Sequence, residues 1–388
     1  MEENVQRRRG GAIGLVLICL TMLAVLAGCG SSSSSSSSSA SAGGSSSSSS
    51  SSGASNSNIK VAVLSTGAVN NHSWANSWAD GVAKAGKDLG VKVTMVGNVE
   101  TPDQYVSQGS SFAAQGYNLI MFAHGAMDAP AQKLAKQFPK VQFVQSPFEA
   151  TSAAATAAEP PNLGHVDFKQ EDGTFLAGAL AAMVSKSHKL GAVYAFPFPA
   201  LTRQTEGFDL GARCVSPTTS FTQKSTGSFT DAALARAAGT SLYNGGSDVL
   251  ISAVDQAVQG VISGGQAAGP SHYVVASYYN DTSLGPKVVL ASVLYNLNGI
   301  AEDIIKSYIN HKITPHWYKE YNLANFGVGD LVINPNLSVV TAADKQKLAA
   351  IKAKIVSGAI KVPDAVHGSP TIGTLGAAAK IDPKSIGC

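Results

Sequence analysis

The residues that could do chemistry in this chain lie in the short segments that follow its predicted strands. They are Ser65, Asn70, Asn71, Trp74, His124, Phe196, Phe198, Phe229, Asp255, Ser277 and Tyr279. Aromatic rings and uncharged hydrogen-bonding groups dominate this set, and Asp255 is its one carboxylate. Rings stack on the faces of flat ligands, whereas amides and hydroxyls bind the polar edges of such ligands. The set predicts a site for a flat, neutral, polar solute, of which a nucleobase or nucleoside is one example.

Several of these residues also have a purely structural interpretation. Trp74 lies at a predicted helix start and could anchor the core, while Asn70 and Asn71 could cap that helix. His124 follows a buried strand and could be a structural histidine, and Asp255 could cap the helix after it. The sequence alone leaves both interpretations open for each of these residues.

Catalytic and metal-binding patterns are missing from the sequence. It contains no GxSxG, HExxH, P-loop or GxGxxG motif, and no Ser/His/Asp set lies on compatible strand ends. It also has no CxxC motif and no Cys/His cluster, which argues against a zinc site. We therefore expect a binding protein that is not an enzyme, with no cofactor and no metal.

Short apolar runs alternate with helical segments in both halves of the chain, and these elements position the candidate residues. In the first half, the predicted strands and helices are 59–65, 73–89, 91–96, 102–115, 119–122, 128–137 and 141–145. In the second half, they are 173–184, 190–196, 203–215, 220–226, 231–243, 249–253, 256–267 and 273–277. Continuous apolar strands separated by helices are typical of parallel sheets that are covered on both faces. Ligands of such sheets bind beyond the carboxyl ends of the strands, where the candidate residues lie.

The repeated alternation predicts an α/β fold of two Rossmann-like lobes with parallel sheets, joined by hinge crossovers into a clamshell. We assign residues 59–166 plus 287–316 to lobe one, and residues 167–286 plus 317–366 to lobe two. Residues 367–388 remain as a C-terminal tail.

The first 28 residues have the features of a secretory signal peptide, because three arginines at 7–9 precede an apolar stretch over 12–27. This stretch ends in Leu-Ala-Gly-Cys29, which resembles the bacterial lipobox, whose cysteine is lipidated. An ordinary signal peptide that happens to contain Cys29 is the alternative. Residues 29–58 would then be the lipidated cysteine and a flexible, serine-rich tether. We expect a lipid-anchored protein on the extracytoplasmic face of the cell membrane.

Two cysteines remain once the predicted signal peptide and Cys29 are set aside. Cys214 and Cys388 form an even pair, which in an oxidising compartment suggests a disulfide between lobe two and the tail. Two free thiols are the alternative. Removing residues 1–28 takes away three Arg and two Glu, so the formal net charge falls from +3 to +2. Such a nearly neutral chain, without a basic block after the signal, gives little support for nucleic-acid binding.

An ordered series of short motifs resembles the basic membrane protein (BMP) family of ABC-transporter substrate-binding lipoproteins, which includes purine-nucleoside receptors. The motifs are NNHSW at 70–74, GYNLI at 116–120, FKQEDGTFLAG at 168–178, FPFP at 196–199, TGSFTD at 226–231, VLASV at 289–293 and SGAIKVP at 357–363. The resemblance implies the type I periplasmic-binding-protein clamshell. It also implies that Trp74 matches the aromatic residue that stacks on the base, Asn70 the asparagine of the motif, and Asp255 a polar cleft position.

Three positions depart from the family pattern. Ser65, Asn71 and Ser277 stand where the resemblance leads us to expect aspartates. A carboxylate can accept two hydrogen bonds from the vicinal hydroxyls of ribose, and a serine at position 277 cannot replace both. A free nucleobase, or another small aromatic or polar solute, is therefore as well supported as a nucleoside.

Taken with the anchor, the resemblance predicts the receptor subunit of an ABC importer, whose partners are a small solute, the permease subunits and the membrane. A solute-sensing lipoprotein of the same fold is one alternative. A receptor for a different polar solute, such as a sugar, is another.

Overall fold

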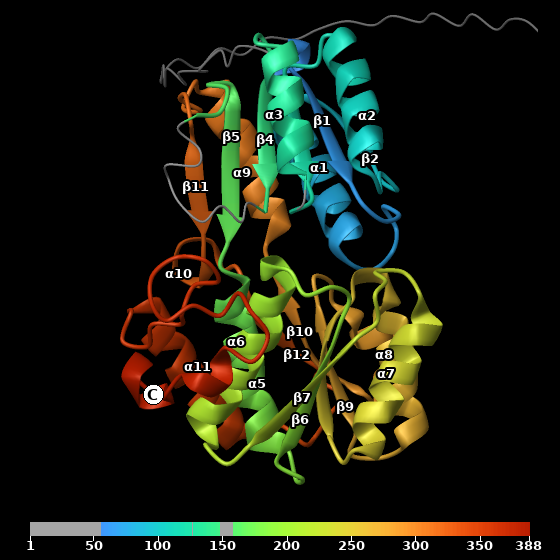
Figure 1. The fold of residues 1–388 in the computed structure, drawn as a ribbon, viewed down its shortest axis with the longest axis vertical. Coiled ribbons are helices and arrows are strands. Elements are labelled where there is room, and N and C mark those ends of the chain that lie inside the picture. Colours follow the sequence, from blue (N-terminus) through green and yellow to red (C-terminus); the bar gives the residue numbers. More distant parts are fainter. Residues whose placement is uncertain (1–55, 126, 148–157) are drawn as a thin grey trace, which may run out of the picture. The chain divides into compact units, whose positions relative to one another are not determined.

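The computed structural model describes residues 56–125, 127–147 and 158–388. The predicted signal peptide, Cys29 and most of the serine-rich segment lie outside these residues. Within them, no helix is both long enough and apolar enough to cross a membrane. Two predominantly parallel sheets, each flanked by helices, confirm the predicted α/β fold of two lobes (Figure 1).

Lobe one contains a sheet with the strand order β11-β5-β4-β3-β1-β2, in which all neighbouring strands are parallel. Its strands are β1 (Lys60–Ser65), β2 (Lys92–Val96), β3 (Leu119–Ala123), β4 (Gln142–Ser146), β5 (Leu163–Phe168) and β11 (Tyr318–Tyr321). Val63 packs in the same core cluster as Trp78, whereas the next residue, Leu64, packs in that of Tyr105. Strand β1 is thus covered on both faces, as its continuous apolar sequence predicts.

Among the described residues, four helices flank this sheet: α1 (Trp74–Leu89), α2 (Pro102–Ala114), α3 (Asp128–Gln137) and α9 (Leu297–Ile309). Helix α2 begins at a capping box in which Thr101 and Gln104 each bind the other's backbone amide. Helix α1 packs closely on α9 because residue 81 is glycine. A Cβ atom at Gly81 would lie 2.9 Å from the Cα atom of Asn298.

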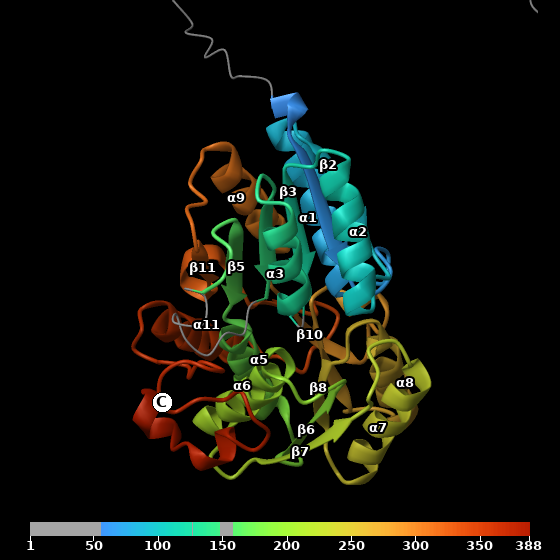
Figure 2. The same ribbon diagram turned by 45° about the horizontal axis from the view of Figure 1, so that its top comes forward.

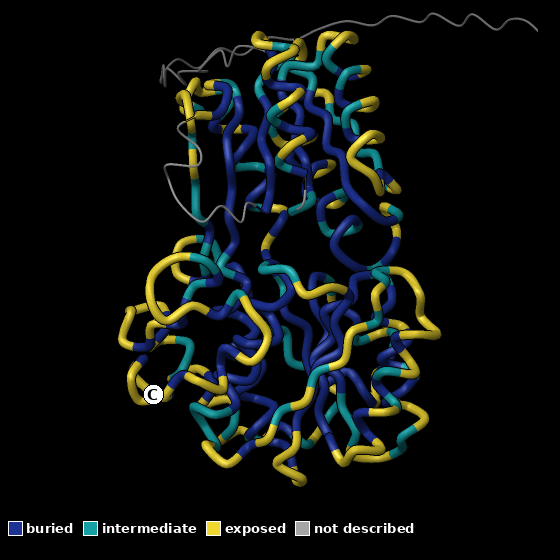
Figure 3. Tube along the Cα trace, in the orientation of Figure 1, coloured by how far each residue is buried: buried dark blue, intermediate teal, exposed yellow. Residues whose placement is uncertain are grey.

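Lobe two contains a sheet with the order β12-β10-β9-β8-β6-β7, in which only β12 is antiparallel to its neighbour. Its strands are β6 (Lys189–Tyr194), β7 (Ser220–Ser225), β8 (Val249–Ala253), β9 (Tyr273–Ser277), β10 (Val289–Leu294) and β12 (Asp330–Ile333). Its helices are α5 (Gln170–Val184), α6 (Pro199–Val215), α7 (Ala232–Asn244), α8 (Val258–Ala268), α10 (Leu323–Phe326) and α11 (Ala342–Val356). Figure 2 shows the two sheets from a second direction, and Figure 3 shows that the inner strands of the sheets are buried.

The strand pairing corrects the predicted lobe boundaries. Strand β10 was expected in lobe one but pairs with β9 of lobe two, and β11 was expected in lobe two but pairs with β5 of lobe one. The chain therefore passes between the lobes after β5, after β10 and after β11. Apolar periodicity identifies a strand but not its partner, so the order of the crossovers could not be read from the sequence.

Strand β5 was missing from the predicted strands although all six of its residues are buried. Its apolar run is interrupted by His165 and Asp167, each of which has a buried polar partner. His165 hydrogen-bonds with Glu159, and Asp167 accepts from Arg203. These partners make burial of the two polar side chains possible.

Arg203 and Asp167 form an ion pair where the chain passes from β5 into α5. The Nη1 atom of Arg203 donates to an Asp167 carboxylate oxygen at 3.1 Å and to the Phe168 carbonyl at 2.6 Å. Both side chains are buried, although Asp167 belongs to lobe one and Arg203 to α6 of lobe two. The pair therefore joins the lobes at the hinge.

The C-terminal tail is held along helix α6. The carboxylate of Glu206 accepts hydrogen bonds from the backbone amides of Gly376 and Ala378, each at 2.8 Å. The structure also contains a disulfide between Cys214, near the end of α6, and Cys388.

We expect intact-mass analysis without reductant to find no alkylated thiol at Cys214 or Cys388. Replacing both residues by serine should lower the unfolding free energy by about 2–4 kcal/mol, because the disulfide closes a long loop of the unfolded chain. Chemical denaturation of the soluble domain measures the change. Two alkylated thiols in the untreated protein would contradict the disulfide.

Candidate ligand-binding site

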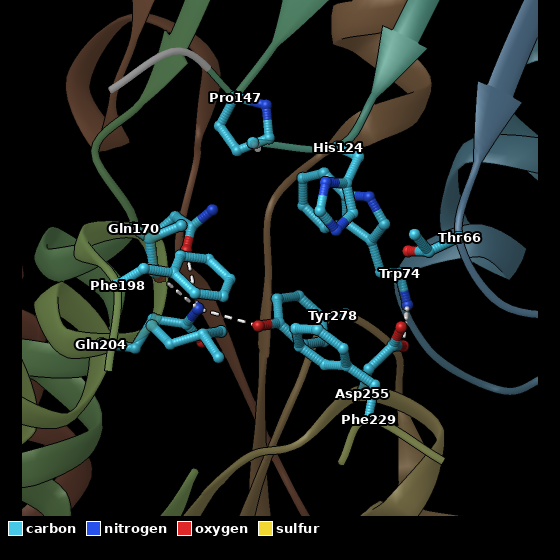
Figure 4. Close-up of a pocket in the computed structure, with 13 residues that line it drawn as sticks. Thr66, Trp74, His124, Pro147, Gln170, Phe198, Gln204, Phe229, Asp255 and Tyr278 are labelled. Carbon is cyan, nitrogen blue, oxygen red and sulfur yellow. Dashed lines mark hydrogen bonds between the residues drawn. The ribbon is translucent and has the colours of Figure 1, made fainter. Parts of the chain in front are cut away.

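A cavity lies between the lobes, at the carboxyl ends of the strands. It encloses about 420 Å³ of empty space, part of it open to solvent. Its lining residues are Thr66, Trp74, His124, Gly125, Pro147, Gln170, Phe198, Ala200, Leu201, Gln204, Phe229, Asp255 and Tyr278 (Figure 4). Both lobes contribute to this list, so the cavity is complete only when the lobes are together.

Trp74 serves both the core and the cavity wall. As the first residue of α1, it donates from its indole Nε1 to the Ala123 carbonyl at 2.8 Å, which fixes the ring at the end of β3. The ring centroid lies 5.9 Å from that of Phe168 and 5.5 Å from that of Tyr278. The two interpretations of Trp74 that the sequence left open are therefore compatible.

Asp255 belongs to lobe two but bonds to lobe one. One of its carboxylate oxygens accepts from the backbone amide of Trp74 at 3.1 Å and from the side-chain amide of Asn71 at 3.5 Å. Its φ of 51° places it in the left-handed region, just after β8. The carboxylate thus joins the lobes and does not cap the helix that follows it.

Burial is the main reason why the pKa of Asp255 is raised to about 6, with a further contribution from the Glu100 charge. Ser73 and the backbone amide of Trp74 act in the opposite direction, because they stabilise the ionised form.

Two glutamines and two tyrosines form a buried network along one wall. The Nε2 atom of Gln204 donates to Gln170 Oε1 at 2.7 Å, to the Ala200 carbonyl at 2.8 Å and to the Tyr278 hydroxyl at 2.8 Å. The Tyr295 hydroxyl donates to Gln204 Oε1 at 3.2 Å. Gln170 is the first residue of α5 and Gln204 lies in the second turn of α6, so the packing of these helices positions both amides.

The rest of the wall is aromatic and uncharged. Burial lowers the pKa of His124 to about 4, so its imidazole is neutral at pH 7. Its ring centroid lies 6.5 Å from that of Phe229, which in turn lies 6.2 Å from that of Phe198. No lysine or arginine is among the residues that line the cavity in the described part of the chain.

The structure brings together five of the residues predicted from the sequence. Trp74, His124, Phe198, Phe229 and Asp255 all line the cavity. They come from the ends of separate strands or from the loops after them, which is where parallel sheets place their ligand-binding residues.

The other predicted residues do not line the cavity. Ser65 donates to the backbone carbonyl of Thr66 at 3.1 Å, and the side-chain amide of Asn71 donates to the Asp255 carboxylate at 3.5 Å. Asn70 is exposed, and Phe196 packs on the Phe229 ring with the centroids 5.1 Å apart.

After strand β9, the predicted positions were displaced by one residue. Ser277 is buried and Tyr279 lines a different hollow, whereas Tyr278 between them faces the cavity. Tyr278 has a φ of 78°, so strand alternation, which favours Ser277 and Tyr279, no longer holds at that point.

Gln170 and Gln204 were not predicted. Both are almost fully buried within helices, at 2% and 1% exposure. Uncharged amides among the buried residues of a helix are the signal that could have identified them, because buried polar groups need partners.

One group of possible metal ligands occurs in the described part of the chain, away from this cavity. Single ligand atoms of Asp128, Glu159 and His165 lie within 4.8 Å of one another in lobe one. Within the group, the imidazole Nε2 of His165 and a Glu159 oxygen are 2.5 Å apart, and Gln132 donates to both carboxylates. Protein hydrogen bonds therefore already account for the proximity of these side chains.

Comparison with known proteins points to one family. Residues 58–365 match the Bmp family, described as ABC transporter substrate-binding protein PnrA-like. A Lactococcus lactis protein named ABC transporter nucleoside-binding protein BmpA is 26% identical, over 90% of this chain and 98% of its own. Basic membrane protein D of Borreliella burgdorferi is 28% identical over 53% of this chain and 60% of its own.

The fold is similar to that of solved solute-binding proteins. The crystal structure of an ABC transporter solute-binding protein from Aeropyrum pernix K1 matches with a TM-score of 0.67 and 18% identity. The match covers 78% of this chain and 92% of that chain. At this identity the likeness shows the fold alone.

We expect the closed form to become more populated as the pH falls from 7 to 5. The raised pKa of Asp255, about 6 in the closed structure against an ordinary 3.8 when exposed, means that the closed form binds a proton more readily. Linkage then shifts the equilibrium toward closure by roughly tenfold over this interval. Fluorescence energy transfer between dyes on the two lobes measures the closed fraction.

The control for this prediction is Asp255→Asn, which keeps an acceptor for the Trp74 amide but does not titrate. The variant should show a smaller dependence of closure on pH. An identical pH profile in both proteins would exclude Asp255 as the titrating group.

Proposed function

Because the chain belongs to the Bmp family of ABC transporter substrate-binding proteins, we propose that it is a lipid-anchored receptor that delivers a nucleoside or nucleobase to an importer. The cavity between the lobes, whose described lining is mostly aromatic and uncharged with Asp255 as its one carboxylate, is the observation that carries the ligand class. Trp74, Phe198, Phe229 and Tyr278 supply rings, and the neutral His124 adds a fifth. Such walls suit a flat, neutral ring system whose edges form hydrogen bonds.

A free base fits these walls better than a nucleoside bound through its ribose. Asp255 is the only carboxylate among the described lining residues, and one of its oxygens already accepts from the backbone amide of Trp74. Ser277, at a position where the family resemblance suggests a ribose-binding carboxylate, is buried away from the cavity. The name of the Lactococcus protein supports the wider nucleoside class.

Binding is coupled to closure through the hinge. A solute in the cavity would contact Trp74 and His124 from lobe one and Phe198, Phe229 and Gln170 from lobe two. These contacts exist together only in the closed form, so the solute stabilises that form by its additional contacts. The permease subunits would then distinguish the closed, loaded receptor from the open one.

The ligand class is tested by calorimetry and thermal shift on the soluble domain, with nucleobases, nucleosides, sugars and amino acids. We expect nucleobases or nucleosides to raise the melting temperature. Phe229→Ala should weaken their binding by roughly 1–3 kcal/mol, because a ring that stacks on the base is lost. We choose Phe229 over Trp74 because Trp74 also packs in the core.

Phe326→Ala is the matched control, since this phenylalanine is also partly buried but does not line the cavity. It should leave the affinity unchanged. A melting temperature that rises with a sugar, and with no base or nucleoside, would show the ligand class to be wrong.

The anchor is tested by Cys29→Ala in the full-length chain. We expect this variant to lose labelling by a palmitate analogue and to leave the membrane fraction, because no lipid can attach at position 29. Cys19→Ala, within the predicted signal peptide, is the control and should stay membrane-bound. Equal membrane retention of both variants would count against lipidation at Cys29.

A further inference from the structure

The orientation of the Gln204 amide follows from its partners. Its Nε2 atom lies 2.8 Å from the Ala200 carbonyl, which can only accept a hydrogen bond. The group at this position must therefore be the NH2 and not the carbonyl oxygen. The Tyr295 hydroxyl, which donates to the other end of the amide, is consistent with this orientation.

The orientation of Gln204 in turn determines that of Gln170. Because an amide nitrogen cannot accept a hydrogen bond, the Gln170 atom 2.7 Å from Gln204 Nε2 must be its oxygen. The Gln170 NH2 group therefore points away from Gln204, on the side of Pro147 in the view of Figure 4. Among the described residues, this NH2 group has no hydrogen-bond acceptor.

Gln170 is therefore a fixed donor. Its side chain is 2% exposed, and its oxygen is engaged by a glutamine that is itself held by Ala200, Tyr278 and Tyr295. Reversing the Gln170 amide would place two NH2 groups against each other, so the donor cannot adapt to the ligand.

The acceptor of the cavity lies on the other side. Asp255 presents a carboxylate to the same cavity, and it lies on the opposite side from Gln170 in the view of Figure 4. A flat ligand in this space would meet a donor at one edge and an acceptor at the other.

We infer that Gln170 determines specificity by selecting nucleobases that present a carbonyl oxygen to its NH2 group, such as 6-oxopurines over 6-aminopurines. This inference rests on the proposed function. An exocyclic amino group would place a second donor against Gln170 and leave the Gln170 NH2 group unpaired. In adenine the only acceptors near that amino group are the ring nitrogens N1 and N7, so the base would have to shift in its plane to pair one of them with the Gln170 NH2 group. An unpaired buried donor weakens binding considerably.

The test compares hypoxanthine with adenine by titration calorimetry. We expect the unmodified protein to bind hypoxanthine roughly 10- to 100-fold more tightly, the effect of one buried, unmatched donor. In Gln170→Glu, one oxygen still accepts from Gln204 Nε2, and the other replaces the NH2 group as an acceptor. The preference should then disappear or reverse toward adenine.

Two further variants control this result. Gln266→Glu makes the same change of charge at an exposed position of α8 and should keep the preference of the unmodified protein. Gln170→Met removes the donor without adding a charge and should reduce the preference toward equality. Melting temperatures of the ligand-free variants establish that each one is folded.

The outcomes separate the two proposals. Equal affinity for both bases in the unmodified protein, or a preference that survives Gln170→Glu in folded protein, would overturn the role of Gln170 while nucleobase binding stands. If neither base nor any nucleoside binds the unmodified protein, the proposed ligand class fails, and the specificity role fails with it. A preference for hypoxanthine that is lost in both Gln170 variants and kept in Gln266→Glu supports the inference.

Discussion

The buried ion pair between Arg203 and Asp167 is the interaction on which the geometry of the site depends. It holds the end of β5 in lobe one against the second turn of α6 in lobe two, where the chain crosses between the lobes. Removing one partner of a buried pair typically costs about 3–5 kcal/mol, because the other charge is left without compensation. Gln204 follows Arg203 directly, and Gln170 lies three residues after Asp167. The pair that fixes the hinge thereby fixes the two amides of the cavity wall.

The close packing of α5 on α6 makes this arrangement possible. A Cβ atom at Gly178 would lie 1.9 Å from the Phe208 carbonyl oxygen, and one at Gly211 equally close to that of Phe175. Glycine at both positions lets the two helix backbones approach, and the N-terminal parts of the helices bring Gln170 and Gln204 within hydrogen-bonding distance. The contacts between α5 and α6 thus determine the hinge and the polar wall of the cavity together.

The sequence predicted the elements of this fold better than their connections. Strands β8 and β9 and helix α3 have the predicted bounds, because short apolar runs and helical spacing of apolar residues report local structure directly. The assignment of β10 and β11 to lobes was wrong, because the partner of a strand depends on contacts between residues that are distant in sequence. Five residues of the cavity were identified because they follow the carboxyl ends of predicted strands, whereas Gln170 and Gln204 were missed. Their role depends on hydrogen bonds between two helices, and the spacing of residues along one helix does not reveal such bonds.

Recognition and closure are distributed unequally between the lobes. Lobe two contributes the carboxylate of Asp255 and the amide of Gln170, whereas lobe one contributes Trp74, the hydroxyl of Thr66 and the neutral His124. Asp255 also accepts from the Trp74 amide, so one carboxylate faces the solute and holds the lobes together. A solute that engages Asp255 must therefore do so without losing that bond, which favours a small base over a ligand with a vicinal diol. Under the proposed function, Asp255 would therefore contribute both to the binding of the solute and to the stability of the closed form.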